Sequence, residues 1–246
     1  MNACTSSKEL LIFTFLGLPG SGKGTLAAAC DEKPGFIRLS TGDLFRTQMA
    51  LQTDFGKKIA EFMQSGQLVP DSLVTQTVIN WLEKHKRLHS RIILDGFPRT
   101  AAQAKEFIDL FLHKYEKVSF RVIVLRISRD ELAIRMMTRL VCQNPECQAV
   151  YSLRVKLPKK EGLCDLCGFP LIHRNDDKKE VIEERFFVYE RHLEDLLAEY
   201  ARNKYKIINI DVEDKAPEDV FELFRGVCGD FFVNTYPTTL KEANNG

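Results

Sequence analysis

Near its N-terminus the chain reads Gly17-Leu-Pro-Gly-Ser-Gly-Lys-Gly-Thr25. This stretch follows the apolar run Leu10–Leu16, which indicates a buried parallel strand. The glycines let the backbone form a concave loop whose N–H groups point inward, and such a loop at the start of a helix binds polyphosphate. The stretch therefore predicts a phosphate site with Lys23 on the outer phosphates; a Gly-rich turn without a ligand is the alternative.

The stretch departs from the general P-loop pattern at one position. The pattern G-x-x-x-x-G-K-[ST] is met from Gly17 to Lys23, but Gly24 stands where Ser or Thr is expected, and Thr25 follows. A hydroxyl shortly after the lysine can contact Mg²⁺.

The rest of the chain alternates between strand and helix patterns. We predict strands at 36–39, 91–95, 120–127 and 204–210, and helices at 23–30, 41–51, 54–65, 71–86, 130–140, 177–200 and 217–228. Another helix begins at Thr100, capped by its own hydroxyl, and Asp71 is the expected N-cap of its helix. This alternation predicts an α/β fold, a parallel β-sheet flanked by helices with right-handed crossovers.

Composition narrows the class of protein. The 246 residues suffice for one sizeable domain with insertions, and a net charge of +1 gives no overall attraction to nucleic acid or membrane. Seven cysteines cannot form a complete set of disulfides, and we find neither a secretory pattern nor a run of transmembrane length. We therefore expect a cytoplasmic enzyme with reduced thiols, with no nucleic-acid or membrane partner.

A section from 141 to about 175 breaks the alternation and has no helical periodicity. Cys142 and Cys147 are followed, after sixteen residues, by Cys164 and Cys167, a spacing that matches a tetrahedral Cys₄ zinc site. Four thiolates leave no open position, so we predict one structural zinc ion and no catalytic metal. The alternatives are two disulfides or unligated buried thiols.

Several arginines fall where they can converge on phosphate. Arg135 and Arg139 are four residues apart on a predicted helix and would share one face. Arg99 comes shortly after a strand that ends at Asp95, and function lies at the C-terminal ends of strands in open α/β sheets. Asp95, at the end of this strand, is placed like the acidic residue that is directed toward Mg²⁺ in P-loop proteins. The alternatives are solvated surface arginines and an Asp95 that caps the next turn.

Four blocks give the chain a specific resemblance. They are 17–25, Ser40-Thr-Gly-Asp-Leu-Phe-Arg46, Leu94-Asp-Gly-Phe-Pro-Arg-Thr-Ala-Ala-Gln103, and Arg174-Asn-Asp-Asp177 with Arg185. Together they resemble the adenylate kinases of the long-lid, zinc-containing type, in which Gly-Thr after the P-loop lysine is a family trait. The resemblance implies the P-loop nucleoside monophosphate kinase fold and reversible, Mg²⁺-dependent phosphoryl transfer from ATP to AMP, giving two ADP.

The resemblance also implies residue roles. The residues that would bind ATP are Gly20, Ser21, Gly22, Lys23, Gly24, Thr25, Arg139, Tyr151 and Lys215. Those that would bind AMP are Thr41, Arg46, Gln67, Leu68, Val69, Gly96, Arg99 and Gln103. Asp95 would serve Mg²⁺. The residues expected to act on the transferred group are Lys23, Arg135, Arg174 and Arg185.

The same resemblance divides the chain. Residues 1–39, 70–139 and 178–233 would form the core, 40–69 the AMP-binding insert, 140–177 the zinc-binding lid and 234–246 a flexible tail. We expect a monomer that maintains the balance of adenine nucleotides. A sister kinase that uses GTP, UMP or CMP is an alternative. Another is a zinc-ribbon module that binds nucleic acid or protein through the basic residues Arg154, Lys156, Lys159 and Lys160.

Overall fold

The predicted parallel sheet is present. The computed structural model describes residues 10–86, 91–115, 117–154 and 156–229. Within them, a five-stranded sheet has the order β2-β3-β1-β4-β8, with every neighbouring pair parallel. Its strands are β1 (Leu10–Leu16), β2 (Phe36–Ser40), β3 (Arg91–Asp95), β4 (Val118–Arg126) and β8 (Lys206–Asp211).

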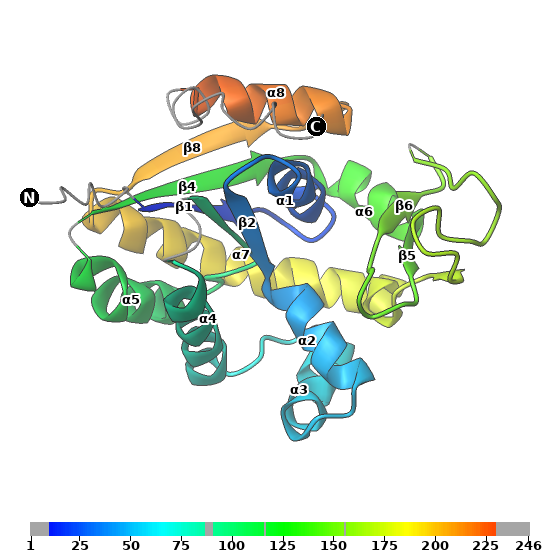
Figure 1. Cartoon of the computed structure of the whole chain (residues 1–246), viewed down its shortest axis with the longest axis horizontal. Coiled ribbons are helices and arrows are strands. Elements are labelled where there is room, and N and C mark those ends of the chain that lie inside the picture. The colour runs from blue at the N-terminus through cyan, green and yellow to red at the C-terminus, as the bar shows by residue number, and fades with distance from the viewer. Residues whose placement is uncertain (1–9, 87–90, 116, 155, 230–246) are drawn as a thin grey trace, which may run out of the picture.

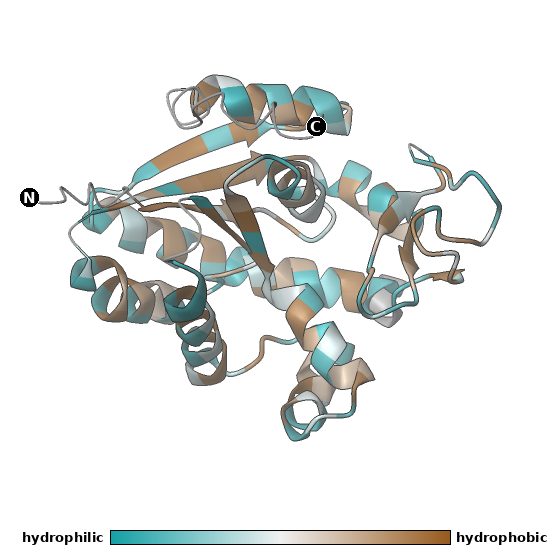
Figure 2. Ribbon diagram, viewed as in Figure 1, coloured by the Kyte–Doolittle hydropathy of each residue, from teal (hydrophilic) through white to brown (hydrophobic). Residues whose placement is uncertain are grey.

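Helices cover both faces of this sheet (Figure 1). They are α1 (Lys23–Asp31) and α8 (Pro217–Val227) on one face, and α4 (Asp71–His85), α5 (Ala101–Leu110) and α7 (Lys179–Arg202) on the other. Along β1, Ile12 and Leu16 pack into the core under α4, α5 and α7, whereas Phe13 and Phe15 pack into the core under α1 and α8. Burial on both faces explains why β1 is apolar apart from Thr14, and brown predominates along the strands in Figure 2, with teal where polar residues interrupt them.

Two helices lead away from the sheet after β2 (Figure 1). They are α2 (Thr41–Ala50) and α3 (Asp54–Ser65), together called the α2–α3 hairpin below. The Ser40 hydroxyl accepts from the N–H of Asp43 to cap α2, and the Thr53 hydroxyl accepts from Gly56 to cap α3. The hairpin therefore begins directly at the C-terminal edge of the sheet.

The helix predicted over 130–140 is shorter than expected. The structure has α6 (Arg129–Met137), and Arg139–Cys142 is instead a strand, β5. Thr138 ends the helix, and β5 pairs antiparallel with β6 (Val150–Ser152) and β7 (Leu171–Ile172) in a second sheet. The prediction that Arg135 and Arg139 share a helix face was therefore wrong. Residues 139–172 are called the β5–β7 segment below. The described residues between 141 and 172 contain no helix, as the missing helical periodicity predicted.

Other details differ from the sequence reading in small ways. Short 3₁₀ turns lie at Leu112–Lys114 and Asn175–Asp177. Thr100 caps α5 with its hydroxyl as predicted, but the N-cap of α4 is Pro70, and Asp71 is the first helical residue. In the described part of the chain, no helix is long and apolar enough to cross a membrane. The predicted tail, 234–246, lies outside the described residues.

Candidate active site

The phosphate loop connects β1 to α1 as predicted. Gly20 and Gly22 both adopt left-handed backbone conformations, with φ of 87° and 94°, which favour glycine. Lys23 opens α1, and its Nζ donates to the carbonyl oxygens of Gly17 at 2.6 Å and Leu18 at 2.9 Å. The lysine ammonium therefore lies against the loop that the sequence pattern assigns to phosphate.

Lys23 is the centre of a cluster of charges drawn from distant parts of the chain. Burial lowers its pKa to about 7, Asp95 opposes that shift, and the nearby cations Arg99, Arg185 and Arg139 add to it. A buried lysine among arginines favours an anion as a ligand, because an anion restores its charged form. Burial raises the pKa of Asp95 at the end of β3, against the effect of Lys23.

The loop after β3 meets the start of α2. The Thr41 hydroxyl donates to the Gly96 carbonyl at 3.1 Å, and Nε of Arg99 donates to the same oxygen at 2.8 Å. The Gln103 amide oxygen accepts from the backbone N–H of Arg99 at 2.8 Å, and its nitrogen donates to Asp71 at 2.7 Å. Four residues predicted for AMP are thus brought together, and Gln103 is held at both ends of its amide.

Arg46 of α2 and Arg174 approach each other across Asp43. Arg46 forms an ion pair with Asp43, and Nη2 of Arg174 lies 3.8 Å from the same carboxylate. Burial lowers the pKa of Arg174 to about 9, and Arg46 and Arg139 contribute to this. The Nε atoms of both arginines are buried without a hydrogen-bond partner among the described residues. Both residues line a cavity of about 360 Å³, and two guanidinium groups beside one cavity favour an anion as its ligand.

Two further arginines are held by adjacent carboxylates. Nε of Arg139 donates to Asp177 at 2.7 Å, and its Nη2 reaches the other oxygen of that carboxylate. Nη1 of Arg185, on α7, lies 3.0 Å from Asp176 and 3.2 Å from Asp177. Burial lowers the pKa of Arg185, and Asp176 opposes it. The carboxylates fix the planes of both guanidinium groups.

Arg135 does not join this cluster. Its Nε lies 2.9 Å from Glu131, and its Nη2 donates to the Val212 carbonyl at 3.2 Å, just beyond β8. Lys215 lies in the loop between β8 and α8. The structure thus places Arg135 beside the end of β8 rather than with the other predicted catalytic arginines.

The connection from α3 to α4 contains Gln67, Leu68 and Val69. The Gln67 amide nitrogen donates to Glu184 on α7, and Val69 is buried in the main core. Thr25, two residues after the P-loop lysine, is exposed on α1.

The four cysteines of the β5–β7 segment form one cluster. Their sulfur atoms all lie within 4.8 Å of one another, with 3.3 Å between Cys142 and Cys167 and 3.8 Å between Cys147 and Cys164. A tetrahedral Zn²⁺ with Zn–S bonds of about 2.3 Å requires sulfur–sulfur distances of about 3.8 Å. The four thiols therefore fit one zinc ion.

Tyr151 supports this cluster instead of facing a nucleotide. Only 3% of its surface is exposed, and its hydroxyl accepts from the N–H of Asp165 at 2.8 Å and lies 3.6 Å from the sulfur of Cys164. Burial alone would raise the pKa of Cys164. Hydrogen bonds from Tyr151 and from nearby backbone N–H groups outweigh the effect of burial and lower that pKa to about 6. The expected contact between Tyr151 and ATP is inconsistent with this position, so we withdraw it.

The α2–α3 hairpin and the β5–β7 segment touch directly. The Gln148 amide nitrogen donates to the Thr47 hydroxyl at 2.8 Å and to the Asp43 carbonyl at 3.2 Å. Thr47 in turn donates to the Pro145 carbonyl at 3.3 Å. The two outlying parts are therefore in direct contact beside Asp43, which pairs with Arg46 and lies 3.8 Å from Arg174.

Comparison with known proteins identifies this architecture. Residues 15–205 match the family model described as adenylate kinase. The chain belongs to the adenylate kinase family. An adenylate kinase from Archaeoglobus fulgidus is 42% identical over 197 residues, covering 80% of this chain and 88% of that protein. One from Thermoanaerobacter is 39% identical over 215 residues, covering 87% and 96%, and one from Mycoplasma mycoides is 37% identical over 211 residues, covering 86% and 96%.

Membership of this family makes the chain a nucleoside monophosphate kinase, a phosphotransferase. The expected resemblance to adenylate kinases is thereby confirmed.

The carboxylates that arrange the arginines were not predicted from the sequence. Asp43, Asp176 and Asp177 hold the guanidinium groups of the cluster, and Asp71 holds Gln103. Three of the four lie inside the quoted blocks, so their position within a motif was the available signal.

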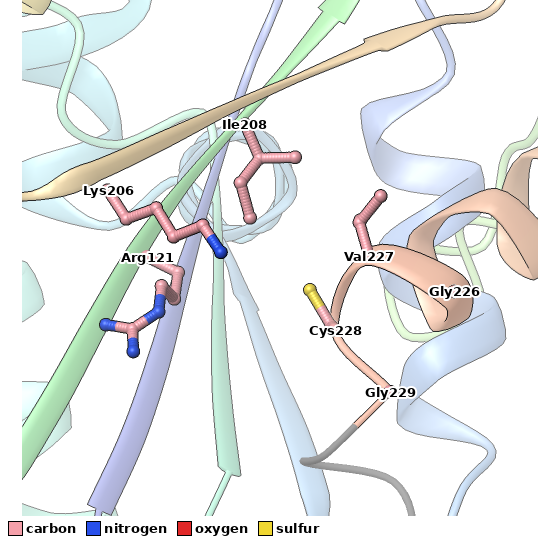
Figure 3. Close-up of a pocket in the computed structure, with 7 residues that line it drawn as sticks. All are labelled: Arg121, Lys206, Ile208, Gly226, Val227, Cys228 and Gly229. Atoms are coloured by element: carbon pink, nitrogen blue, oxygen red, sulfur yellow. The ribbon is translucent and has the colours of Figure 1, made fainter.

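A second cavity, of about 230 Å³, lies away from the cluster. Figure 3 shows Arg121 and Lys206, near the N-terminal ends of β4 and β8, together with the sulfur of Cys228 after α8. Because the arginine cluster lies at the C-terminal edge of the sheet, this cavity is not part of the kinase site.

Proposed function

We propose that this chain catalyses the reversible transfer of a phosphoryl group from ATP to AMP, giving two ADP, as a monomer. The observation that carries the proposal is the gathering of Asp95, Arg99, Arg139 and Arg185 around Lys23 at the C-terminal edge of the sheet. Phosphoryl transfer depends mainly on positioning and on neutralising charge that is spread over the phosphate oxygens. A site rich in partly buried cations, with no nucleophile required, suits that chemistry.

We assign the two nucleotides to opposite sides of Lys23. Residues 20–25 would hold the ATP phosphates, with Arg135 and Lys215 on its base side at the end of β8. Thr41, Arg46 and Arg99 would hold the AMP phosphate, and Gly96, Gln103 and residues 67–69 its adenosine. Arg139, Arg174 and Arg185 would receive the group in transit.

Residues 40–69 would act as the AMP-binding insert and 140–177 as the lid, with Gln148 joining them when both are closed. Enclosure by these two parts would exclude water, which would otherwise hydrolyse ATP.

Asp95 is the residue we assign to Mg²⁺, since it is a buried carboxylate beside Lys23. When bound, Mg²⁺ supplies charge neutralisation on the phosphates. The four cysteines we assign to one structural Zn²⁺, on the sulfur distances given above. Metal analysis of the reduced protein should return one zinc per chain, and chelation should lower the melting temperature. Zinc near zero with unchanged melting would refute this assignment.

An ADP-production assay with AMP, UMP, CMP and GMP as acceptors tests the main proposal. Turnover should be fastest with AMP at millimolar ATP·Mg²⁺. The absence of turnover with AMP would refute the main proposal. Lys23→Met should abolish turnover while leaving the melting temperature close to that of the wild type. Retained turnover would remove Lys23 from the mechanism. Nucleic-acid binding without turnover would favour the zinc-ribbon alternative, although its Arg154 is already paired with Glu131 at 2.8 Å.

A further inference from the structure

Tyr189 of α7 has a buried hydroxyl that donates no hydrogen bond to any described residue. A buried hydroxyl without a partner is unfavourable, because it has given up water and gained nothing in return. Such a group in a native protein calls for an explanation, and a ligand is one of them.

The surroundings of Tyr189 offer hydrogen-bond donors and positive charge. Burial raises the pKa of Tyr189, while the backbone N–H of Gly17 and the charges of Arg126 and Arg99 act in the opposite direction. Nε of Arg99 is engaged with Gly96, and Nε of Arg126 with Asn209 at 3.0 Å. The neighbours that act on the hydroxyl are therefore an N–H group and two cations. What the O–H hydrogen lacks is an acceptor.

Tyr200, eleven residues later on the same helix, provides the contrast. Its hydroxyl is also buried without a partner in the described part of the chain. Its ring, however, lies among aromatic side chains, 5.4 Å from Phe120 and 6.2 Å from Tyr205 between ring centroids. Burial and Tyr205 raise its pKa, and no cation opposes them. Tyr200 is a core residue, whereas Tyr189 is under the influence of the backbone N–H of Gly17, the first residue of the phosphate loop, and of the charge of Arg99.

We propose that the Tyr189 hydroxyl donates a hydrogen bond to a phosphate oxygen of the acceptor nucleotide, beside Arg99. An anionic oxygen supplies the missing acceptor, and the same oxygens suit the cations around it. The inference rests on the proposed function, since Arg99 is assigned to the AMP phosphate there. It adds a residue of α7 to a subsite otherwise built from α2 and from the loop after β3.

The test compares Tyr189→Phe with the matched control Tyr200→Phe. Calorimetric titration should show that Tyr189→Phe weakens AMP binding about tenfold, as expected for a hydrogen bond to a charged group. ATP binding should stay within about twofold of the wild type in the same titrations. KM for AMP should rise with kcat nearly unchanged, because the bond is present before and during transfer. Tyr200→Phe should change none of these values. Both variants should melt at or above the wild-type temperature, because each loses an unpartnered hydroxyl.

Three results would overturn the inference. One is unchanged AMP affinity in Tyr189→Phe, and another is an equal loss of AMP and ATP affinity, which would indicate a general distortion of the site. The third is a lowered melting temperature, which would show that the hydroxyl has a structural partner. Wild-type protein that fails to bind AMP would instead count against the proposed function.

Discussion

Gly56 is the position at which the α2–α3 hairpin tolerates no side chain. A Cβ atom there would lie 2.1 Å from the carbonyl oxygen of Gln48, 2.4 Å from its carbonyl carbon and 2.8 Å from the nitrogen of Met49. All three are backbone atoms of α2, so no side-chain rotation relieves the clash. Gly56→Ala must therefore push the two helices apart, at the point where Phe45 packs edge-on to Phe55.

The size of the effect follows from two opposing contributions. Alanine improves helix propensity by about 1 kcal/mol over glycine. Overpacking costs about 1–3 kcal/mol when side chains can adjust, and backbone clashes at this distance lie at or above the top of that range. We expect Gly56→Ala to lose at least about 2 kcal/mol of unfolding free energy. Because α2 carries Thr41 and Arg46, KM for AMP should rise while KM for ATP stays near the wild-type value.

The matched control is Gly226→Ala in α8. A Cβ atom there meets nothing within 4 Å. The variant should therefore gain up to about 1 kcal/mol from helix propensity. Urea unfolding of both variants measures the two free energies at a common m-value. A Gly56→Ala protein as stable as the wild type, or an equal loss in Gly226→Ala, would refute the argument from close approach.

Three further predictions concern other parts of the molecule. Burial raises the pKa of Glu83, but hydrogen bonds from Lys86, Tyr115 and Lys114 outweigh burial and lower that pKa to about 2. The stability that the Glu83 carboxylate supplies is therefore complete above its ordinary pKa of about 4.5 and is lost as the pH falls toward 2. The difference in urea midpoint between the wild type and Glu83→Gln should close over that pH range, and a constant difference would contradict this. Gln148→Ala should weaken ATP and AMP binding together by about fivefold, the value of a net hydrogen bond, and an effect on one nucleotide alone would argue against a joint closure. Asp71→Ala should lower the melting temperature and reduce the preference for AMP in the acceptor series, since Gln103 loses its partner; unchanged selectivity would separate Gln103 from adenine recognition.

What could be predicted from the sequence was mostly local. The loop at 17–25 and the strand before it are specified by adjacent residues, because glycine spacing and continuous apolar character need no partner to be recognised. The clustering of the four cysteines was also predictable, since closely spaced pairs on turns impose their own geometry. Thr100 was recognised as a helix cap because its hydroxyl accepts from the N–H of Gln103, only three residues later.

What could not be predicted depended on pairing across the chain. Residues 139–142 continue a helical pattern in the sequence but form β5, because they pair antiparallel with β6 on one side and β7 on the other. Tyr151 was placed by resemblance, whereas its orientation is set by Asp165 and Cys164. Arg135 pairs with Glu131 four residues earlier on α6, which helical spacing allows, but its hydrogen bond to the Val212 carbonyl depends on packing against the end of β8, which no spacing along one helix reveals.

The departure of Gly24 from the general P-loop pattern has a structural reason in this chain. A Cβ atom at Gly24 would lie 3.2 Å from a carboxylate oxygen of Asp95. Serine or threonine at this position would crowd the acid at the end of β3, which is also the charge that opposes the lowered pKa of Lys23. Thr25 is already exposed, so the loop keeps a hydroxyl one residue later without that contact. The glycine thus allows Asp95 to approach the start of α1, where Lys23 lies, as the proposed function requires of an acid and a lysine that would serve the same phosphates.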